Sequence, residues 1–282
     1  MRRISVASGA GIGGSVGASL ESHMGVEPFG RLNLSGRVII VTGGSSGIGQ
    51  ATAMLLAGRG ACVVIADLDD RGGNTVAASI RDAGGRAGFI HTDTAIEEQV
   101  KRSVDFALSE FGGLHGAFNN AGIMSKGASL VEMPLADWQK SMDVNLTGVF
   151  LCMKYQIGHM VNHGGGAVVN TSSGAGVVGF PNLPDYVASK HGVIGLTRAA
   201  AVDFSARGVR INAVLPGGTE TPMLSNAMGK DPVVRAAVER GHPIGRLGSA
   251  SEIGEAVAWL LSDAASFVTG AIFAIDGGYT SV

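Results

Sequence analysis

Residues 38–49 read Val-Ile-Ile-Val-Thr-Gly-Gly-Ser-Ser-Gly-Ile-Gly, and a stretch with helical composition follows as far as Arg59. The apolar run predicts a buried strand, and the glycines directly after it predict a tight turn into a helix. Glycine at such a turn lets backbone N–H groups approach a pyrophosphate, which the positive end of the helix dipole also attracts. A glycine-rich turn is weak evidence alone, so its meaning depends on the residues around it.

A second apolar run, residues 61–66, ends in Asp67. A carboxylate at the end of the second strand of a nucleotide-binding unit accepts hydrogen bonds from the adenosine ribose and repels a 2′-phosphate. The nearby positions Ser46 and Leu68 carry no basic group, and Arg71 is the nearest cation in the sequence. This pattern favours NAD over NADP. Asp67 could instead be a turn former or a helix cap, since aspartate is common at both.

Tyr186 and Lys190 lie four residues apart in Tyr-Val-Ala-Ser-Lys, and Ser173 lies thirteen residues upstream. On a helix, that spacing puts the phenol and the ammonium on one face. A free phenol titrates near pH ~10, and a neighbouring cation favours its ionised form. The pattern therefore predicts a base that exchanges a proton with an alcohol or carbonyl. Alone, it could be an ordinary helix face, because lysine stems readily pack beside aromatic rings.

In this order, the motifs resemble those of the short-chain dehydrogenase/reductase family over residues 34–282. Residues 42–49 match the family's Thr-Gly-x-x-x-Gly-x-Gly turn, and residues 119–122 match its Asn-Asn-Ala-Gly element. Residues 216–217 and 221–223 match the segment that holds the nicotinamide carboxamide in relatives. The residues that match the family's catalytic tetrad are Asn145, Ser173, Tyr186 and Lys190.

The resemblance implies that NAD is bound by these motifs and by Asp93, which follows an apolar run and matches an adenine-contacting position. The expected cofactor-binding residues are Gly43, Ser45, Ser46, Gly47, Ile48, Asp67, Leu68, Asp93, Thr94, Asn120, Ala121, Gly122, Tyr186, Lys190, Pro216, Gly217, Thr219, Thr221 and Met223. Because the match is made residue by residue, the position of each of these residues can be checked in the structure.

The resemblance also implies the chemical roles. Tyr186 takes the hydroxyl proton of a secondary alcohol as hydride passes to nicotinamide, and Ser173 lies beside the same oxygen. Lys190 lowers the pKa of Tyr186 and bonds the nicotinamide ribose, while Asn145 supports a proton path by holding a water. A shift of roughly three pKa units requires about 4 kcal/mol of differential interaction. Asn145 could instead simply bond backbone carbonyls at a helix distortion.

Buried runs alternate with helical stretches along the chain, at residues 38–42, 61–66, 87–91, 114–119, 166–171, 209–215 and 271–275. This alternation predicts an α/β fold, a single-domain, Rossmann-like, doubly wound parallel sheet of about seven strands with helices on both faces. Residues 34–282 are expected to form this NAD-binding catalytic domain. Residues 1–33 are expected to be a flexible Gly/Ser-rich extension, an expression remnant, or the result of a start placed before a true start at Met24.

Composition excludes several classes. The net charge is −2 and charged residues make up 16% of the 282, so the basic excess of a nucleic-acid-binding protein is missing. No run of about eighteen apolar residues predicts a membrane span. Cys62 and Cys152 are expected to be core residues of a cytoplasmic protein. His159 and His163 have no acidic or cysteine partners at ligand spacing, so no metal is expected.

The expected substrate pocket is apolar, and its candidate lining is Met124, Val178, Phe180, Met223, Leu224 and Met228. Such walls favour an apolar or cyclic alcohol, although each residue could belong to the core. Residues 150–155 and 242–246 also resemble bacterial NAD-dependent dehydrogenases that act on cyclic alcohols and dihydrodiols.

The predicted function is therefore NAD-dependent oxidation of a secondary alcohol, with a small alcohol or ketone as the partner molecule. One alternative is an NAD(P)H-dependent ketone or 3-oxoacyl reductase, which Asp67 disfavours. Another is a non-catalytic nucleotide-sensing protein that keeps the fold, which the intact tetrad disfavours. By resemblance, the helix from residue 186, its predecessor and the region around residues 276–278 imply a homotetramer.

Overall fold

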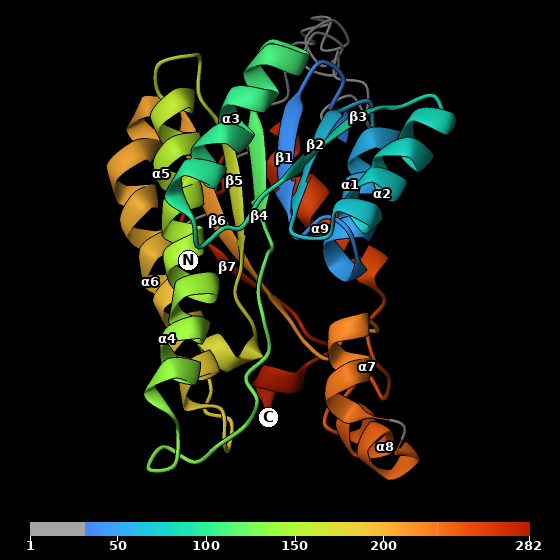
Figure 1. Cartoon of the computed structure of the whole chain (residues 1–282), viewed down its shortest axis with the longest axis vertical. Coiled ribbons are helices and arrows are strands. Elements are labelled where there is room, and N and C mark those ends of the chain that lie inside the picture. The colour runs from blue at the N-terminus through green and yellow to red at the C-terminus, as the bar shows by residue number, and fades with distance from the viewer. Residues whose placement is uncertain (1–31, 230) are drawn as a thin grey trace, which may run out of the picture. The chain divides into compact units, whose positions relative to one another are not determined.

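The computed structural model describes residues 32–229 and 231–282. Seven parallel strands form one sheet in the order β3-β2-β1-β4-β5-β6-β7 (Figure 1). The strands are β1 (Val38–Thr42), β2 (Cys62–Asp67), β3 (Arg86–His91), β4 (Gly116–Asn119), β5 (Gly166–Thr171), β6 (Val209–Pro216) and β7 (Ile272–Ile275). The α-helices are α1 (Gly47–Gly58), α2 (Asp70–Asp82), α3 (Glu97–Phe111), α4 (Leu135–Met142), α5 (Gly148–Met160), α6 (Pro184–Phe204), α7 (Pro222–Met228), α8 (Pro232–Arg240) and α9 (Ala250–Leu261).

The predicted doubly wound sheet is confirmed, and each predicted strand end agrees with the structure to within two residues. The extension predicted for residues 1–33 lies, as far as residue 31, outside the described residues. Its flexibility, and the domain boundary that it implies, stay predictions.

Two hydrophobic cores lie on opposite faces of the sheet because side chains alternate along each strand. In β1, Ile39 and Val41 pack in one core with α1, α2 and α9. Val38 and Ile40 pack in the other core with α3, α5 and α6. Both faces are therefore covered, which is why the central strands read as continuous apolar runs.

The polar ends of the parallel strands meet at one edge of the sheet. Thr42, Asp67, Asn119, Thr171 and Pro216 are the last residues of β1, β2, β4, β5 and β6. In sheets of this type, ligands bind outside the carboxyl ends of the strands. The helices α7 and α8 extend beyond this edge (Figure 1).

A buried amide cluster joins β4 and β5 to the helices beneath this edge. The Asn119 side chain donates to Gln156 Oε1 at 3.0 Å and to Asn170 Oδ1 at 2.9 Å, and it accepts from Gln156 Nε2 at 2.9 Å. Asn170 Nδ2 in turn donates to Thr197 Oγ1 at 3.0 Å. Because each buried amide finds a partner, the cluster holds α5 and α6 in fixed positions against the sheet.

The cysteines and the histidine pair lie away from this edge or inside the core. Cys62 and Cys152 are both buried thiols, as expected, and burial raises the pKa of Cys152 to about 12. The rings of His159 and His163 stack with centroids 3.9 Å apart. Residues 32–229 and 231–282 hold no metal-binding group of three or more His, Cys, Asp or Glu, and none of their helices is long and apolar enough to cross a membrane.

Candidate active site

The glycine-rich turn between β1 and α1 is built at positions where a side chain would not fit. A Cβ on Gly43, whose φ is +63°, would lie 2.9 Å from Ala121 Cα, and a Cβ on Gly49 would lie 2.0 Å from Gly43 O. The α1 N-terminus begins at Gly47 after an extended Ser46, and within the described residues the Ser46 side chain makes no capping hydrogen bond. The turn thus presents backbone at the helix end, where an anion such as a pyrophosphate binds.

The segment after β4 is tied to this turn through Thr42. Its Oγ1 accepts from the backbone N–H groups of Asn120 at 3.0 Å and Ala121 at 3.1 Å. Asn120 Nδ2 donates back to the carbonyl oxygens of Thr42 and Gly43, both at 3.2 Å. The structure therefore brings the predicted residues Gly43, Asn120 and Ala121 into direct contact.

Asp67 lies between the turn and the loop after β2. Its carboxylate accepts from Ser45 N–H at 2.9 Å and from Asp69 N–H at 3.0 Å. Asp69, not Asp67, caps α2, by accepting from Gly72 N–H at 3.0 Å. A carboxylate offers about four acceptor positions, so Asp67 keeps capacity for ribose hydroxyls while its orientation is fixed. Leu68, next in the sequence, has an exposed side chain.

The predicted adenine-side residues follow β3, which pairs with β2. Asp93 accepts from Ala95 N–H at 2.9 Å, and its own N–H donates to Gln99 Oε1 at 2.8 Å. Thr94 is buried against α5, because a Cβ on Gly148 would lie 2.8 Å from Thr94 Oγ1. Both residues therefore reach the same edge of the sheet as Asp67.

The segment after β6 returns to the glycine-rich turn. A Cβ on Gly217 would lie 2.7 Å from Asp276 Cα, so β6 and β7 leave room only for glycine there. Thr221 caps α7 by accepting from Leu224 N–H at 3.3 Å, and its Cγ2 would lie 3.2 Å from a Cβ on Gly47. This places the predicted pyrophosphate and nicotinamide segments side by side.

Two further predicted residues of this segment are located by their burial. Thr219 is buried and pairs with Gly248 in an isolated parallel bridge. Met223, on α7, is 41% exposed. Thr219 is thus part of the support of the segment, while Met223 faces solvent in this structure.

Lys190 lies beneath the predicted reaction centre. Its ammonium donates to Thr171 O at 3.0 Å and lies 5.5 Å from the centroid of the Tyr186 ring. A Cβ on Gly122 would lie 3.6 Å from Lys190 Nζ and 3.1 Å from Asn145 Oδ1. The tyrosine, the lysine and the end of the Asn-Asn-Ala-Gly element therefore meet at one place.

Asn145 lies in a π-helical turn, Asp143–Thr147, between α4 and α5. Its Oδ1 accepts from Ile123 N–H at 2.8 Å, and its Nδ2 donates to Ile123 O at 3.0 Å. The side chain is fully buried. This pairing matches the interpretation of Asn145 as a backbone support at a helix distortion, and the water-holding role stays a prediction.

The pKa values of the central pair are both governed by burial. Burial raises the pKa of Tyr186 above its usual 10.0, and a hydrogen bond with Ser173 partly opposes this increase. Burial lowers the pKa of Lys190 to about 8. In the chain without its cofactor the pKa of Tyr186 is therefore raised, and the predicted lowering, which concerns the cofactor complex, stays a prediction. Lys190, whose own pKa burial lowers to about 8, loses its charge before the phenol ionises, so it does not offset the desolvation of the phenolate.

The shifted pKa of Lys190 makes a testable contribution to stability. The pKa of Lys190 in the folded protein, about 8, lies below its usual value of 10.5, so between these two values the unfolded chain binds more protons. Wild-type stability should therefore rise with pH over this range relative to Lys190→Met. We expect the difference in unfolding free energy to change by about 2–3 kcal/mol in favour of wild type. Urea unfolding at pH values across this range measures it.

Lys126→Met removes an exposed, ion-paired lysine and is the matched control for the loss of one charge. If the difference in unfolding free energy between wild type and Lys190→Met stays constant with pH, burial does not lower the pKa of Lys190.

Two residues that the motifs did not indicate also belong to this edge. His242, buried, accepts from Gly218 N–H at 2.8 Å through Nε2, and its Nδ1 lies 2.7 Å from Val238 O. The Tyr279 ring stacks on Phe180 with centroids 5.7 Å apart and packs against His242 at 5.0 Å. No spacing rule links these positions, because they come from three separate loops.

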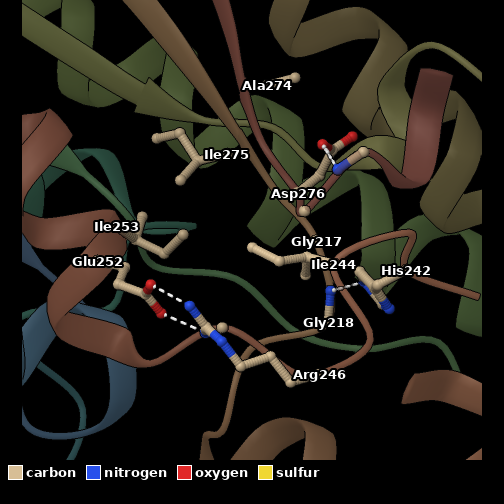
Figure 2. A pocket seen from close by; sticks show the side chains of 13 residues that line it. Gly217, Gly218, His242, Ile244, Arg246, Glu252, Ile253, Ala274, Ile275 and Asp276 are labelled. Carbon is tan, nitrogen blue, oxygen red and sulfur yellow. Dashed lines mark hydrogen bonds and ion pairs between the residues drawn. The ribbon is translucent and has the colours of Figure 1, made fainter. Parts of the chain in front are cut away.

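A cavity of about 290 Å³ lies where these loops meet (Figure 2). Its lining is Gly217, Gly218, His242, Ile244, Arg246, Gly248, Glu252, Ile253, Ala274, Ile275, Asp276, Gly277 and Gly278. The six residues predicted to line the substrate pocket are not part of this lining, so their placement around a substrate stays a prediction.

Comparisons with known proteins identify the family of this chain. A short-chain dehydrogenase/reductase family model, described as enoyl-(acyl carrier protein) reductase, matches residues 43–280. The 2,5-dichloro-2,5-cyclohexadiene-1,4-diol dehydrogenase of Sphingobium indicum is 51% identical over 251 residues, or 89% of this chain and 99% of that protein. The cis-4-hydroxycyclohexanecarboxylate dehydrogenase of Sinomonas cyclohexanicum is 50% identical over 246 residues, or 87% and 97%.

A solved structure shows the same fold. The crystal structure of levodione reductase matches with a TM-score of 0.85 at 38% identity, over 88% of this chain and 99% of that one. The family expected from the motifs is confirmed over nearly the whole described part of the chain. The chain is thus an oxidoreductase that belongs to the short-chain dehydrogenase/reductase family.

Proposed function

We propose that this protein oxidises a secondary alcohol on a six-membered carbon ring to the ketone, with NAD as the hydride acceptor and Tyr186 as the proton acceptor. The observation that carries the proposal is the meeting of Tyr186, Lys190 and Gly122 beside the glycine-rich turn. Proton removal and hydride acceptance need these two parts at one place. When bound, the nicotinamide supplies the hydride chemistry, and the chain supplies orientation and charge.

Four residues of the chain have distinct roles in this reaction. Ser173, whose hydroxyl lies close enough to Tyr186 to lower the pKa of the phenol, orients the alcohol oxygen toward it. Tyr186 receives the hydroxyl proton. Lys190, buried beside it, would bond the nicotinamide ribose and supply positive charge that favours the phenolate. Asn145 holds the Ile123 backbone next to this pair.

The choice of NAD is supported by the Asp67 carboxylate at the end of β2. Two backbone N–H groups hold it in place, and the next residue, Leu68, carries no charge that would attract a phosphate. A 2′-phosphate in this place would meet a carboxylate, whereas two ribose hydroxyls would meet acceptors. Membership of the family accounts for a nicotinamide cofactor, and Asp67 supports NAD in preference to NADP.

A ring substrate is supported by relatives and by the stacked pair of Tyr279 and Phe180. Two relatives that are half identical are named for alcohols on six-membered rings. The Tyr279 ring lies near the serine loop, because its Cδ1 would lie 3.7 Å from a Cβ on Gly174. A flat aromatic wall beside Ser173 suits the face of a ring.

We expect Tyr279→Ala to raise the KM for cyclohexanol about tenfold while kcat changes less than about threefold, because the wall binds the ring and does no chemistry. Steady-state kinetics with cyclohexanol and with 2-hexanol measure the effect. Tyr279→Phe keeps the stacked ring and is the matched control. An equal loss for both alcohols would contradict a wall that selects rings.

The experiment that tests the proposed function is a substrate panel read by the absorbance of reduced nicotinamide. Ring alcohols and ring diols with NAD should be oxidised faster than open-chain alcohols. Faster reduction of a 3-oxoacyl substrate with NADPH would overturn the proposal and favour the reductase alternative. Binding of NAD without turnover of any member would favour the nucleotide-sensing alternative.

The homotetramer and the cytoplasmic location remain parts of this proposal. The assembly is supported by the exposed apolar side chains Phe150 on α5 and Val202 on α6, since the family resemblance assigns these two helices to an interface between copies. Light scattering of the purified protein measures the mass, and a monomer would contradict this part of the proposal.

A further inference from the structure

His242 joins two segments that flank the candidate cofactor site. Its Nε2 accepts from the backbone N–H of Gly218, two residues after the end of β6, at 2.8 Å. Because that nitrogen is an acceptor, Nδ1 carries the proton and donates to Val238 O of α8 at 2.7 Å. Figure 2 shows the imidazole directed at the Gly218 N–H from the side of the cavity. The ring is only 3% exposed, so water does not readily replace either bond.

Gly218 is held tightly, and the imidazole forms part of what holds it. A Cβ on Gly218 would lie 2.8 Å from His242 Cε1 and 2.9 Å from Leu247 Cδ2, so the ring packs directly on the backbone. The Gly218 carbonyl accepts from Gly248 N–H at 2.9 Å, and the preceding Gly217 N–H donates to Ile275 O at 3.1 Å. His242 adds a side-chain hydrogen bond to these backbone hydrogen bonds. A buried N–H that loses its acceptor costs more than the bond itself is worth.

We propose that His242 is a positioning residue that fixes residues 216–219 in the conformation that accepts the nicotinamide end of the cofactor. The inference rests on the proposed function, since it assigns a support to the cofactor site named there. The same imidazole packs against Tyr279, whose ring stacks on Phe180. His242 therefore connects the cofactor segment to the wall proposed for the substrate.

Two variants separate the bonds of the imidazole. His242→Gln places an amide oxygen at the distance of Nε2, where it can accept from Gly218 N–H. His242→Asn places its amide at the distance of Nδ1, where it can donate to Val238 O but cannot reach Gly218. Both variants lose the ring that packs on Tyr279, and each keeps one of the two hydrogen bonds, so the comparison sets the Gly218 bond against the Val238 bond.

The measurement is calorimetric binding of NADH and of ADP-ribose, which lacks the nicotinamide. We expect His242→Asn to weaken NADH binding about tenfold and to leave ADP-ribose binding within about twofold, as the loss of one buried hydrogen bond implies. His242→Gln should bind NADH within about threefold of wild type. Circular dichroism melting of each variant verifies that the binding experiments are made on folded protein.

The inference is overturned if His242→Asn binds NADH as wild type does, or if both variants lose NADH and ADP-ribose equally, which is the behaviour of a purely structural residue. A wild-type protein that binds NADH no more tightly than ADP-ribose would overturn the proposed cofactor and this inference together. A wild-type preference for NADH that survives in His242→Asn overturns the inference alone.

Discussion

Tyr186→Phe should lower kcat/KM for a ring alcohol by about a thousandfold or more, while the Kd for NADH changes less than about threefold. Phenylalanine keeps the ring that lies 5.5 Å from Lys190 Nζ and removes the oxygen that accepts the proton. The loss should therefore appear in kcat, since the binding surfaces are intact. Steady-state kinetics and a fluorescence titration with NADH measure the two quantities.

Tyr155→Phe is the matched control for this variant. The Tyr155 hydroxyl is on α5 and donates to the exposed Glu97 carboxylate at 2.8 Å, away from the site. Its removal should leave kcat unchanged. A Tyr186→Phe enzyme that keeps more than about a tenth of the wild-type kcat would show that another group accepts the proton.

Asp67→Ser should reverse the cofactor preference. The serine removes the charge that repels a 2′-phosphate and one acceptor for the ribose hydroxyls. Hydrogen bonds to a carboxylate contribute about 1.5–3 kcal/mol each, so we expect kcat/KM with NAD to fall about a hundredfold and that with NADP to rise about tenfold. Kinetics with both cofactors and one ring alcohol give the ratio.

The control for Asp67→Ser is Asp70→Asn, which removes a neighbouring carboxylate that pairs with His91 at the surface. This variant should change the NAD-to-NADP ratio by less than about threefold, because an exposed charge is screened by solvent. An Asp67→Ser enzyme with an unchanged ratio would contradict the role given to Asp67.

The strands and the glycine-rich turn could be predicted because local patterns determine them. Residues 38–41 are buried on both faces of a parallel sheet, so they read as one apolar run before the turn. The sequence alone could not decide whether Asp67 binds the adenosine ribose or serves as a turn former or helix cap. The structure shows that Asp69 caps α2, which excludes the cap, whereas Asp67 accepts from Asp69 N–H as a turn former does and also from Ser45 N–H.

The pKa of Tyr186 and the surroundings of the site depend on tertiary packing, which no local sequence pattern contains. The pKa of Tyr186 is raised by burial, which depends on the segments that pack around α6 and not on the residues next to Tyr186 in the sequence. His242 and Tyr279 meet only because β6 and β7 are neighbours in the sheet. The predicted pocket lining stays a prediction for the same reason, since six apolar residues from three segments carry no information about a shared space, although Phe180 of that set stacks on Tyr279.

The most direct test of the central claim is the ionisation of Tyr186 itself. The phenolate absorbance of wild type minus that of Tyr186→Phe, titrated with and without NAD, reports this one side chain. Without NAD, the account predicts a pKa above 10.0, because burial raises it. With NAD bound, it predicts a pKa well below 10.0, which Lys190→Met should move back upward. A Tyr186 that ionises no earlier in the complex than in the free protein would contradict its assignment as the base.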